Sequence, residues 1–222
     1  MKLLLTSGGF TNTIEKIFLN LLQKPAELNS VGFITTAANG EENNATWDRI
    51  IWLEEYRNQL RKLKISNIED IGLENKTEKE LEDILLQKDI LFVNGGNTFY
   101  LMYWAERCGF GKIVNKFLQK GGVYVGVSAG SIITCPTIES ASWYPGDINK
   151  VNLENLKGLG IVLFLIHPHF EEAQKDIIED QANQIKFPVV ALTDEQAVFI
   201  DDEKLQVIGK GNKHFFNGFE EK

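Results

Sequence analysis

Short apolar segments alternate with amphipathic segments along most of the chain. Several of the apolar segments are solid runs, such as Ile90–Val93 and Ile161–Ile166, and such runs are typical of strands buried on both faces of a sheet. The pattern predicts strands at residues 2–6, 31–36, 64–69, 89–93, 122–127 and 160–166.

Between these strands, apolar residues recur with the spacing of a helix. Ile14, Phe18 and Leu21 share one stripe of a predicted helix, and Thr77 and Glu80 have the spacing of a capping box. We predict helices at residues 12–22, 46–63, 97–108, 111–119 and 171–185, and one directly after the capping box. The alternation predicts an α/β fold with a doubly wound, mostly parallel sheet flanked by helices on both faces.

The end of the chain has a different pattern. Short apolar segments follow one another without helices at residues 189–193, 197–200, 205–208 and 214–216. Asp201–Lys204 has the composition of a hairpin turn between two of them. We therefore expect antiparallel C-terminal strands that extend the sheet, within a single domain that spans residues 1–222. An exposed edge there could pair two chains, so a homodimer is one expectation.

Composition narrows the class of protein. A hydrophobic content of 43% is that of a globular protein, and a net charge of −8 argues against a nucleic-acid partner. The longest apolar runs are too short to span a bilayer, and the first residues lack the features of a signal peptide, so we expect a cytoplasmic protein without a membrane partner. Cys108 and Cys135 form neither a disulfide framework nor a metal pattern, and no metal or cofactor is expected.

Ligands of open α/β sheets bind beyond the carboxyl ends of the strands, so the residues that follow each strand are the candidate chemistry. Gly126–Gly130 follows a predicted strand and has the pattern Gly-x-Ser-x-Gly, with Ser128 at its centre. On a sharp strand-to-helix turn this serine would be lifted off the sheet as a nucleophile. The alternative is a turn of small residues in which the serine caps a helix.

A second glycine turn, Gly95-Gly96, follows the strand at 89–93. Its N–H groups could bind an anion, or could complete an oxyanion hole together with the N–H of Ala129. The alternative is a simple turn in which Asn97 caps the next helix.

Two of the three histidines flank a proline at a strand end, in the segment His167-Pro168-His169. Proline stiffens the backbone locally, which suits a base that must be aimed at a nucleophile. His169 lies further out of the strand and is the preferred base, and His167 is its competitor. Asp194 and Glu195 follow a later strand, and one of them could orient the imidazole.

These four segments together resemble peptidase family S51, the family of aspartyl dipeptidase (peptidase E) and cyanophycinase. Members of that family carry a Gly-Gly-Asn turn, a Gly-x-Ser-Ala-Gly elbow, a Pro-His-Phe segment and a late acidic residue. The matching segments here are Gly95-Gly96-Asn97, Gly126–Gly130, Pro168-His169-Phe170 and Glu195, with Cys135-Pro136-Thr137-Ile138 similar to the dipeptidase branch. The order Ser…His…acid also differs from that of the α/β-hydrolases.

The resemblance implies a serine-type peptidase that cleaves short peptides through an acyl-enzyme and needs no cofactor. It implies a triad in which Ser128 is the nucleophile, His169 the base and Glu195 the orienting carboxylate, with Asp194 as the alternative. It further implies an oxyanion hole from the N–H groups of Gly96 and Ala129, on a fold similar to class I glutamine amidotransferases.

One segment departs from the family pattern. The dipeptidase branch carries an arginine soon after Pro-His-Phe, whereas residues 170–176 here hold Glu171, Glu172 and a single basic residue, Lys175. A buried substrate carboxylate needs a cation, so strict specificity for N-terminal aspartate is not expected. Asn97, Trp143 and Tyr144 are the candidate substrate-binding residues, although the two aromatic residues could equally serve packing.

Two other functions agree with the same residues. The protein could be a catalytically silent relative that binds an amino acid or a small peptide, or an amidase that acts on another isopeptide-type bond.

Overall fold

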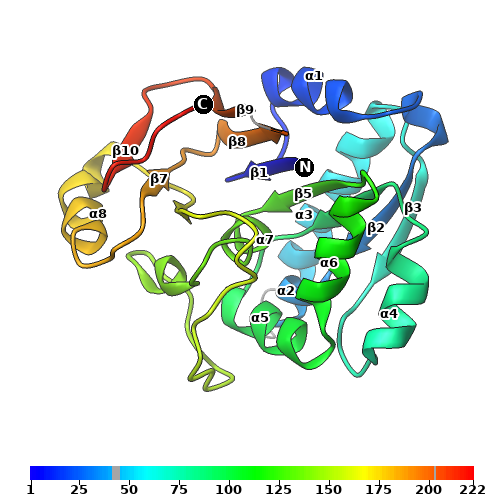
Figure 1. The fold of residues 1–222 in the computed structure, drawn as a ribbon, viewed down its shortest axis with the longest axis horizontal. Coiled ribbons are helices and arrows are strands. Elements are labelled where there is room, and N and C mark those ends of the chain that lie inside the picture. Colours follow the sequence, from blue (N-terminus) through cyan, green and yellow to red (C-terminus); the bar gives the residue numbers. More distant parts are fainter. Residues whose placement is uncertain (42–45, 203) are drawn as a thin grey trace.

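The structure is a computed structural model that describes residues 1–41, 46–202 and 204–222. Within these residues the main sheet has seven strands in the order β3-β2-β4-β5-β1-β8-β9 (Figure 1). The strands are β1 (Lys2–Thr6), β2 (Ser30–Ile34), β3 (Asn67–Ile71), β4 (Ile90–Val93), β5 (Val123–Val127), β8 (Gln196–Asp201) and β9 (Lys204–Gly209).

β1 to β5 run parallel to one another, whereas β8 and β9 join the sheet through antiparallel pairings. β1 pairs with β5 in parallel on one side and with β8 in an antiparallel manner on the other. β8 and β9 form the expected hairpin. The mostly parallel α/β sheet with antiparallel C-terminal strands is therefore confirmed, but the expectation that the segments at 189–193 and 214–216 also extend this sheet is wrong, because they belong to a second sheet.

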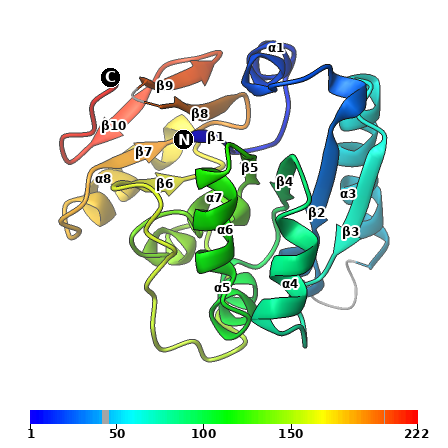
Figure 2. The ribbon, with the colours of Figure 1, turned by 45° about the vertical axis from the view of Figure 1, so that its right-hand side comes forward.

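Helices cover both faces of the main sheet, as Figure 2 shows for α4 and α6 on one face and α3 on the other. The described helices are α1 (Asn12–Leu21), α2 (Thr36–Asn39), α3 (Thr46–Lys62), α4 (Glu78–Leu85), α5 (Thr98–Arg107), α6 (Phe110–Gln119), α7 (Ala129–Ile132) and α8 (Lys175–Ala182). The Thr77–Glu80 capping box forms at the start of α4.

Successive side chains of the central strands point to opposite faces of the sheet and contribute to two separate hydrophobic cores. Leu3 and Leu5 of β1 belong to the core under α4, α5 and α6, whereas Leu4 belongs to the core under α1 and α3. In β4, Leu91 belongs to the same core as Leu3 and Leu5, and Phe92 belongs to the same core as Leu4. Successive side chains of a strand point to opposite faces, so a solid apolar run is what a doubly covered strand requires.

The expectation of a main-sheet strand at 160–166 is wrong. Ile161 and Val162 donate their N–H groups to the carbonyl oxygen of Thr134, so the backbone of this segment is bonded to the residues after α7 rather than to a strand. Only β6 (Leu165–His167) forms, and it pairs in parallel with β7 (Val189–Ala191). With β10 (His214–Phe216) these strands make a separate three-stranded sheet, beside which α8 lies (Figure 1).

Two other boundaries differ from the prediction. β3 begins at Asn67 rather than near 64, because Lys64 adopts a left-handed φ of 67° and Ile65 donates to the carbonyl oxygen of Leu60 to end α3. The predicted helix 171–185 is a 3₁₀ turn at Glu172–Gln174 followed by the shorter α8.

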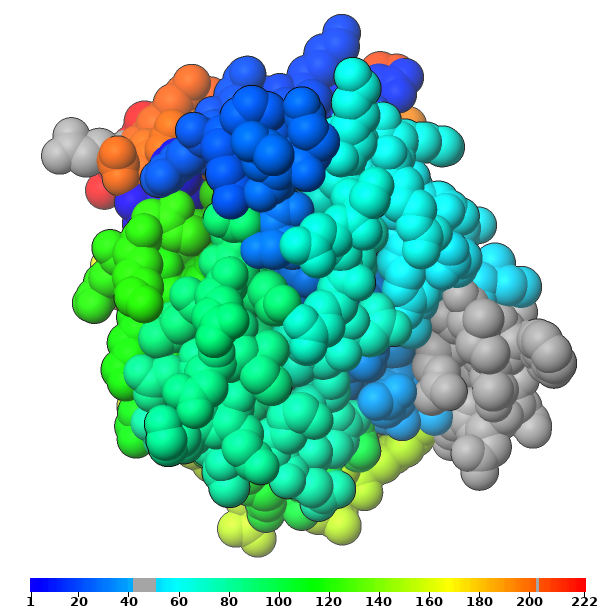
Figure 3. Space-filling view, turned by 90° about the vertical axis from the view of Figure 1, so that its right-hand side faces the viewer, coloured from blue at the N-terminus to red at the C-terminus, as the bar shows by residue number. Residues whose placement is uncertain are grey.

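Figure 3 views the molecule toward the β3 edge, where residues from the first half of the chain form most of the visible surface.

None of the described helices combines the length and the apolar character that a membrane span requires.

Candidate active site

The carboxyl ends of three central strands meet at one edge of the main sheet. Thr6 of β1 is in register with Val127 of β5, and Gly126 of β5 is in register with Val93 of β4. β8 is antiparallel to β1, so its first residue, Gln196, begins at the same edge. Residues that follow β1, β4 and β5 and those that precede β8 are therefore brought together.

Ser128 lies on a strained turn between β5 and α7. Its backbone has φ 48° and ψ −109°, a conformation that residues other than glycine rarely adopt. The serine makes no side-chain capping bond to α7, so the capping alternative does not hold. Its N–H donates to the carbonyl oxygen of Thr6 at 3.0 Å, which ties the turn to β1.

The flanking glycines of the turn are required by close backbone approaches. A β-carbon at residue 130 would lie 2.0 Å from the carbonyl oxygen of Val93, and one at residue 126 would lie 2.6 Å from the carbonyl oxygen of Gly130. Any side chain would push α7 away from β4 and would move Ser128 with it. The Gly-x-Ser-x-Gly pattern thus reflects backbone packing around the serine.

His169 is held in place by its backbone and faces Ser128 with its ring. Its φ of 56° is in the left-handed region, and the next residue, Phe170, donates to the carbonyl oxygen of Leu192 at 3.0 Å. The ring atom Nε2 lies 2.8 Å from Ser128 Oγ. A neutral imidazole protonated on Nδ1 can therefore accept the hydroxyl proton of Ser128.

The carboxylate beside His169 belongs to Asp194, and the expectation that Glu195 fills this place is not met. Asp194 Oδ1 lies 2.6 Å from His169 Nδ1. The two acids sit in a tight turn closed by the N–H of Gln196 and the carbonyl oxygen of Thr193, and Glu195 is exposed at this turn. Adjacent residues of a turn point in different directions, so only one of them can face the ring.

Ser7 is a part of the site that the sequence did not reveal. Its hydroxyl donates to Asp194 Oδ1 at 2.9 Å and accepts the N–H of His169 at 2.7 Å. The residue is fully buried directly after β1, ahead of Gly8 and Gly9. A serine followed by two glycines at a strand's carboxyl end was the available signal.

The surroundings of the Asp194 carboxylate favour its ionised form. The hydrogen bond from His169 lowers the pKa of Asp194, against the opposing effect of partial burial, and the Ser7 hydroxyl lowers it further. The side chains of His169 and Asp194 are 48% and 65% exposed, so the site is open to solvent and to a substrate.

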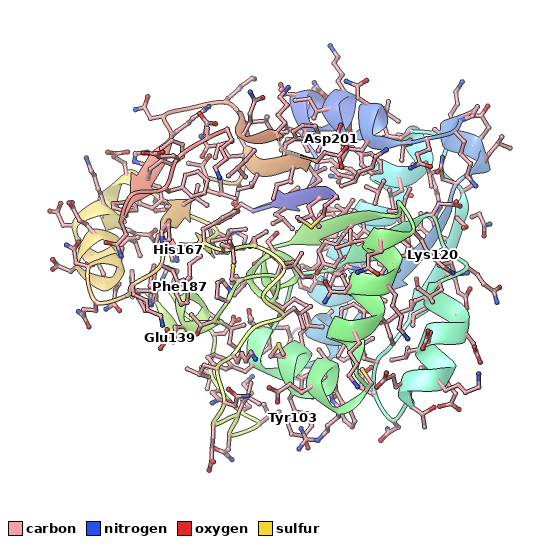
Figure 4. The ribbon with its side chains drawn as sticks, in the orientation of Figure 1. Tyr103, Lys120, Glu139, His167, Phe187 and Asp201 are labelled. Carbon is pink, nitrogen blue, oxygen red and sulfur yellow. The ribbon has the colours of Figure 1, made fainter. Side chains whose placement is uncertain are left out.

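His167, the competing base, lies in the interior away from this arrangement. It is 3% exposed and its ring packs at 5.8 Å against that of Trp143. Neither ring nitrogen has a hydrogen-bond partner among the described residues, and burial lowers the pKa of His167 to about 4. Figure 4 labels His167 together with Glu139, which begins the 3₁₀ turn Glu139–Ser142 that contacts β6.

Two candidate substrate-binding residues have structural roles in this arrangement. Trp143 is 4% exposed within the small core around β6, β7 and α8, which is the packing alternative. Asn97 caps α5 through its Oδ1, which accepts the N–H of Tyr100, and its amide donates to the carbonyl oxygen of Ile148. Tyr144 is 64% exposed and is free to contact a ligand.

The N–H groups of Gly96 and Ala129 are available to an anion. Neither donates a hydrogen bond within the described residues. The two turns are adjacent, because a β-carbon at Gly95 would lie 3.2 Å from Ser128 Cβ. Gly96 has φ 125° and presses against the backbone of Ala37, which fixes the orientation of its turn.

Helix α3 supplies two aromatic residues that the sequence did not point to. A β-carbon at Gly95 would lie 3.7 Å from Cζ3 of Trp52, and one at Gly9 would lie 2.5 Å from Cε1 of Tyr56. Burial raises the pKa of Tyr56 to about 12, and the charge of Asp194 adds to this effect. The two rings thus border the turns that carry the candidate chemistry.

The acidic segment after Phe170 is occupied by internal contacts. Glu171 and Gln174 form a capping box, and Glu172 Oε2 lies 3.2 Å from Nε2 of His214. No cluster of three or more His, Cys, Asp or Glu side chains suited to a metal ion is present in the described part of the chain.

A serine, a histidine and a carboxylate joined by short contacts at the carboxyl edge of an α/β sheet are the arrangement of a serine hydrolase. Comparison with known proteins gives the family. The model of peptidase family S51 matches residues 3–208, and the chain belongs to this family. It is a serine-type peptidase with a fold of the peptidase E type.

Relatives of this chain include two curated proteins. An uncharacterized peptidase of Pasteurella multocida is 26% identical over 208 residues, covering 91% of this chain and 95% of the relative. A peptidase E of Shewanella amazonensis is 28% identical over 178 residues, covering 76% and 72%.

Two solved structures are similar. The crystal structure of a putative peptidase E from Listeria monocytogenes has a TM-score of 0.78 and 26% identity, and covers 95% of this chain and 98% of that one. That of a peptidase from an acI-B1 actinobacterium, at 18% identity and a TM-score of 0.67 over 100% and 92%, supports the fold alone.

Proposed function

We propose that this protein hydrolyses short peptides through an acyl-enzyme, with Ser128 as nucleophile, His169 as base and Asp194 as orienting carboxylate. The observation that carries the proposal is the continuous line of contacts from Ser128 Oγ to Nε2, and from Nδ1 to the carboxylate, at 2.8 and 2.6 Å. Asp194 takes the role first expected for Glu195.

In this mechanism Ser128 Oγ attacks the carbonyl carbon of the scissile bond while its proton passes to His169 Nε2. The ionised Asp194 stabilises the resulting imidazolium, and the N–H groups of Gly96 and Ala129 hold the oxyanion. Collapse of the intermediate breaks the C–N bond, and the leaving amine takes the proton from His169. A water molecule, activated by the same histidine, then hydrolyses the acyl-enzyme.

We further propose that the enzyme is not strictly specific for N-terminal aspartate. Lys175 is the single basic residue of the segment after Phe170, and it shares that segment with Glu171 and Glu172. Trp52 beside Gly95 and Tyr56 beside Gly9 give the neighbourhood an aromatic character instead.

The test is a library of dipeptides and tripeptides, incubated with the wild type and with Ser128→Ala, alongside labelling by a fluorophosphonate probe of serine hydrolases. We expect cleavage and labelling by the wild type alone. Equal cleavage by both proteins would exclude Ser128 as the nucleophile. Ligand-induced thermal stabilisation of both proteins, without any cleavage or labelling, would instead indicate a catalytically silent binding protein. Cleavage confined to Asp-Xaa peptides would contradict the proposed specificity.

A further inference from the structure

Helix α3 begins at the edge of the sheet that carries Ser128. After its last residue, Lys62, a short turn leads into β3, which starts at Asn67 and runs parallel to β2. The end of the helix is therefore at the amino edge of the parallel strands, and its beginning is at their carboxyl edge. Trp52, in the first half of α3, belongs to the part of the helix that is close to the serine turn.

The indole of Trp52 lies beside that turn. The position that a β-carbon of Gly95 would occupy is 3.2 Å from Ser128 Cβ and 3.7 Å from Trp52 Cζ3. The ring edge and the serine side chain therefore face the same small space, next to a residue that has no side chain. The proposed oxyanion donor Gly96 follows directly, so the ring also borders the turn that would hold the carbonyl oxygen of a substrate.

The part of the indole that faces this space is apolar. Cζ3 belongs to the six-membered ring, on the side of the indole away from Nε1. The Nε1 atom is buried and makes no hydrogen bond within the described residues. Trp52 as a whole is only partly buried against the core under α1 and α3, so some of its surface stays accessible. The indole thus offers carbon atoms rather than a donor to a bound peptide.

Tyr56 supports the indole from one turn further along α3. The rings of Trp52 and Tyr56 lie 6.5 Å apart, and the ring of Tyr56 packs at 5.8 Å against that of Phe92 in β4. The core thereby anchors Tyr56, and Tyr56 in turn limits the movement of Trp52. An aromatic surface held in this way keeps its shape when a ligand binds.

The charges around this surface do not suit an acidic side chain. Burial raises the pKa of Tyr56 to about 12, and the charge of Asp194 adds to this effect, so the tyrosine is neutral and negative charge is close to it. The next residue, Arg57, is held by Glu54 at 3.2 Å and by Asp70 at 2.6 Å. A carboxylate bound here would therefore meet an apolar ring and the negative charge of the proposed triad.

We propose that Trp52 forms one wall of a subsite for an uncharged apolar side chain, so that the enzyme prefers peptides with a large aliphatic or aromatic residue beside the scissile bond. The inference rests on the proposed function and names its class of substrate. Contact with such a side chain removes apolar surface of both partners from water, which an alanine does far less. Either residue that flanks the scissile bond can supply this side chain, and the experiment distinguishes the two.

The kinetic experiment compares Leu-Ala, Phe-Ala, Ala-Leu and Ala-Phe with Ala-Ala and Asp-Ala, for the wild type, Trp52→Ala and Trp52→Phe. We expect kcat/KM of the wild type for the larger side chains, in one of the two positions, to exceed that for Ala-Ala roughly 10- to 100-fold. Trp52→Ala should lose most of this ratio, whereas Trp52→Phe keeps an aromatic ring and should retain it. The position that carries the preference identifies the residue that occupies the subsite.

Trp104→Ala is the matched control, because this tryptophan is likewise partly buried but packs against the core on the other face of the sheet. It should keep the wild-type ratio. The assignment of Trp52 would be overturned by a ratio that is the same in the wild type and in Trp52→Ala, or by one that falls equally in Trp104→Ala. A wild-type preference for Asp-Ala over the leucine and phenylalanine peptides would overturn it as well.

Two further measurements separate this inference from the catalytic proposal. Calorimetric binding of Leu-Ala, Ala-Leu and Ala-Ala to Ser128→Ala and to Ser128→Ala/Trp52→Ala tests the subsite without turnover, and fluorophosphonate labelling of the wild type tests the nucleophile without a dipeptide. Tighter binding of a leucine peptide that is lost in the double variant supports the subsite even if labelling fails. Equal binding of leucine peptides and Ala-Ala to Ser128→Ala would overturn it, while normal labelling would leave the catalytic proposal intact.

Discussion

The hydroxyl of Ser7 donates a 2.9 Å hydrogen bond to the carboxylate of Asp194, although 187 positions separate the two residues along the chain. The same oxygen accepts the N–H of His169, so it contacts two members of the proposed triad. We expect Ser7→Ala to lower kcat about tenfold with little change in KM, because the triad loses alignment while the binding surface stays intact. Ser66→Ala, on an exposed loop, is the control. An unchanged kcat would assign Ser7 a purely structural role.

Asp194 and Glu195 can be separated by two variants that each remove one charge. Asp194→Asn should lower kcat on the order of 10³- to 10⁴-fold, because an amide no longer stabilises the imidazolium or the required tautomer. Glu195→Gln should stay close to the wild-type rate, since that side chain is exposed away from the ring. Steady-state kinetics on one dipeptide checks both variants, and the reverse order of effects would restore Glu195 as the orienting residue.

We expect the buried His167 to lower the free energy of unfolding at acidic pH. Its pKa of about 4 lies below the ordinary value of 6.5, so the unfolded chain binds the proton more readily. Stability is then complete above about pH 6.5 and falls as the pH drops toward 4, by about 3 kcal/mol. Urea unfolding at pH 7, 5.5 and 4.5 should show this loss, and His167→Phe should reduce it. An identical pH dependence in the variant would show that other groups are responsible.

We expect the stability contribution of Asp147, which accepts the N–H of Thr98 at the start of α5, to change with pH in the direction opposite to that of His167. Burial raises its pKa above the ordinary 3.8, so its contribution to stability is greatest in acid and is lost as the pH rises through the folded-state value. Asp147→Asn should therefore be more stable than the wild type at pH 7, and the difference should vanish below the ordinary pKa. Thermal unfolding at pH 7 and pH 3.5 measures this. A variant that is less stable at pH 7 would mean that the charge itself supports α5.

Gly130 and Gly160 offer a matched pair of glycine substitutions. Gly130→Ala places a β-carbon 2.0 Å from the Val93 carbonyl oxygen and should displace α7, with a large loss of fluorophosphonate labelling. Gly160→Ala meets no atom within 4 Å and costs only backbone strain, of about 1 kcal/mol at its φ of 64°. Its labelling should match the wild type. Normal labelling of Gly130→Ala would mean that the turn tolerates the shift.

Local patterns were sufficient to identify the central strands, the strained serine turn and the histidine. Each depends on neighbouring residues: solid apolar runs for β4, two glycines around Ser128, and a proline beside His169. The choice between His167 and His169 also followed from position, because the residue further from the strand reaches the site.

Other parts of the site depend on relations that no short segment encodes. Asp194 and Glu195 are neighbours in one tight turn, and the geometry of that turn determines which of them faces the ring of His169. Ser7 meets Asp194 because of the register of β1 with β8. The apolar run at 161–166 has the same pattern whether its N–H groups bind a strand or the residues after α7. In each case long-range pairing determines the outcome.

The antiparallel pairing of β8 with β1 brings Asp194, the last member of the proposed triad in chain order, to the edge of the sheet that carries Ser128. In chain order, β1, β4, β5 and the serine turn all precede Asp194 and β8. The β1 edge that binds β8 is unpaired until that pairing forms. Before β8 pairs with β1, Ser128 and His169 therefore lack the carboxylate that the proposed mechanism requires.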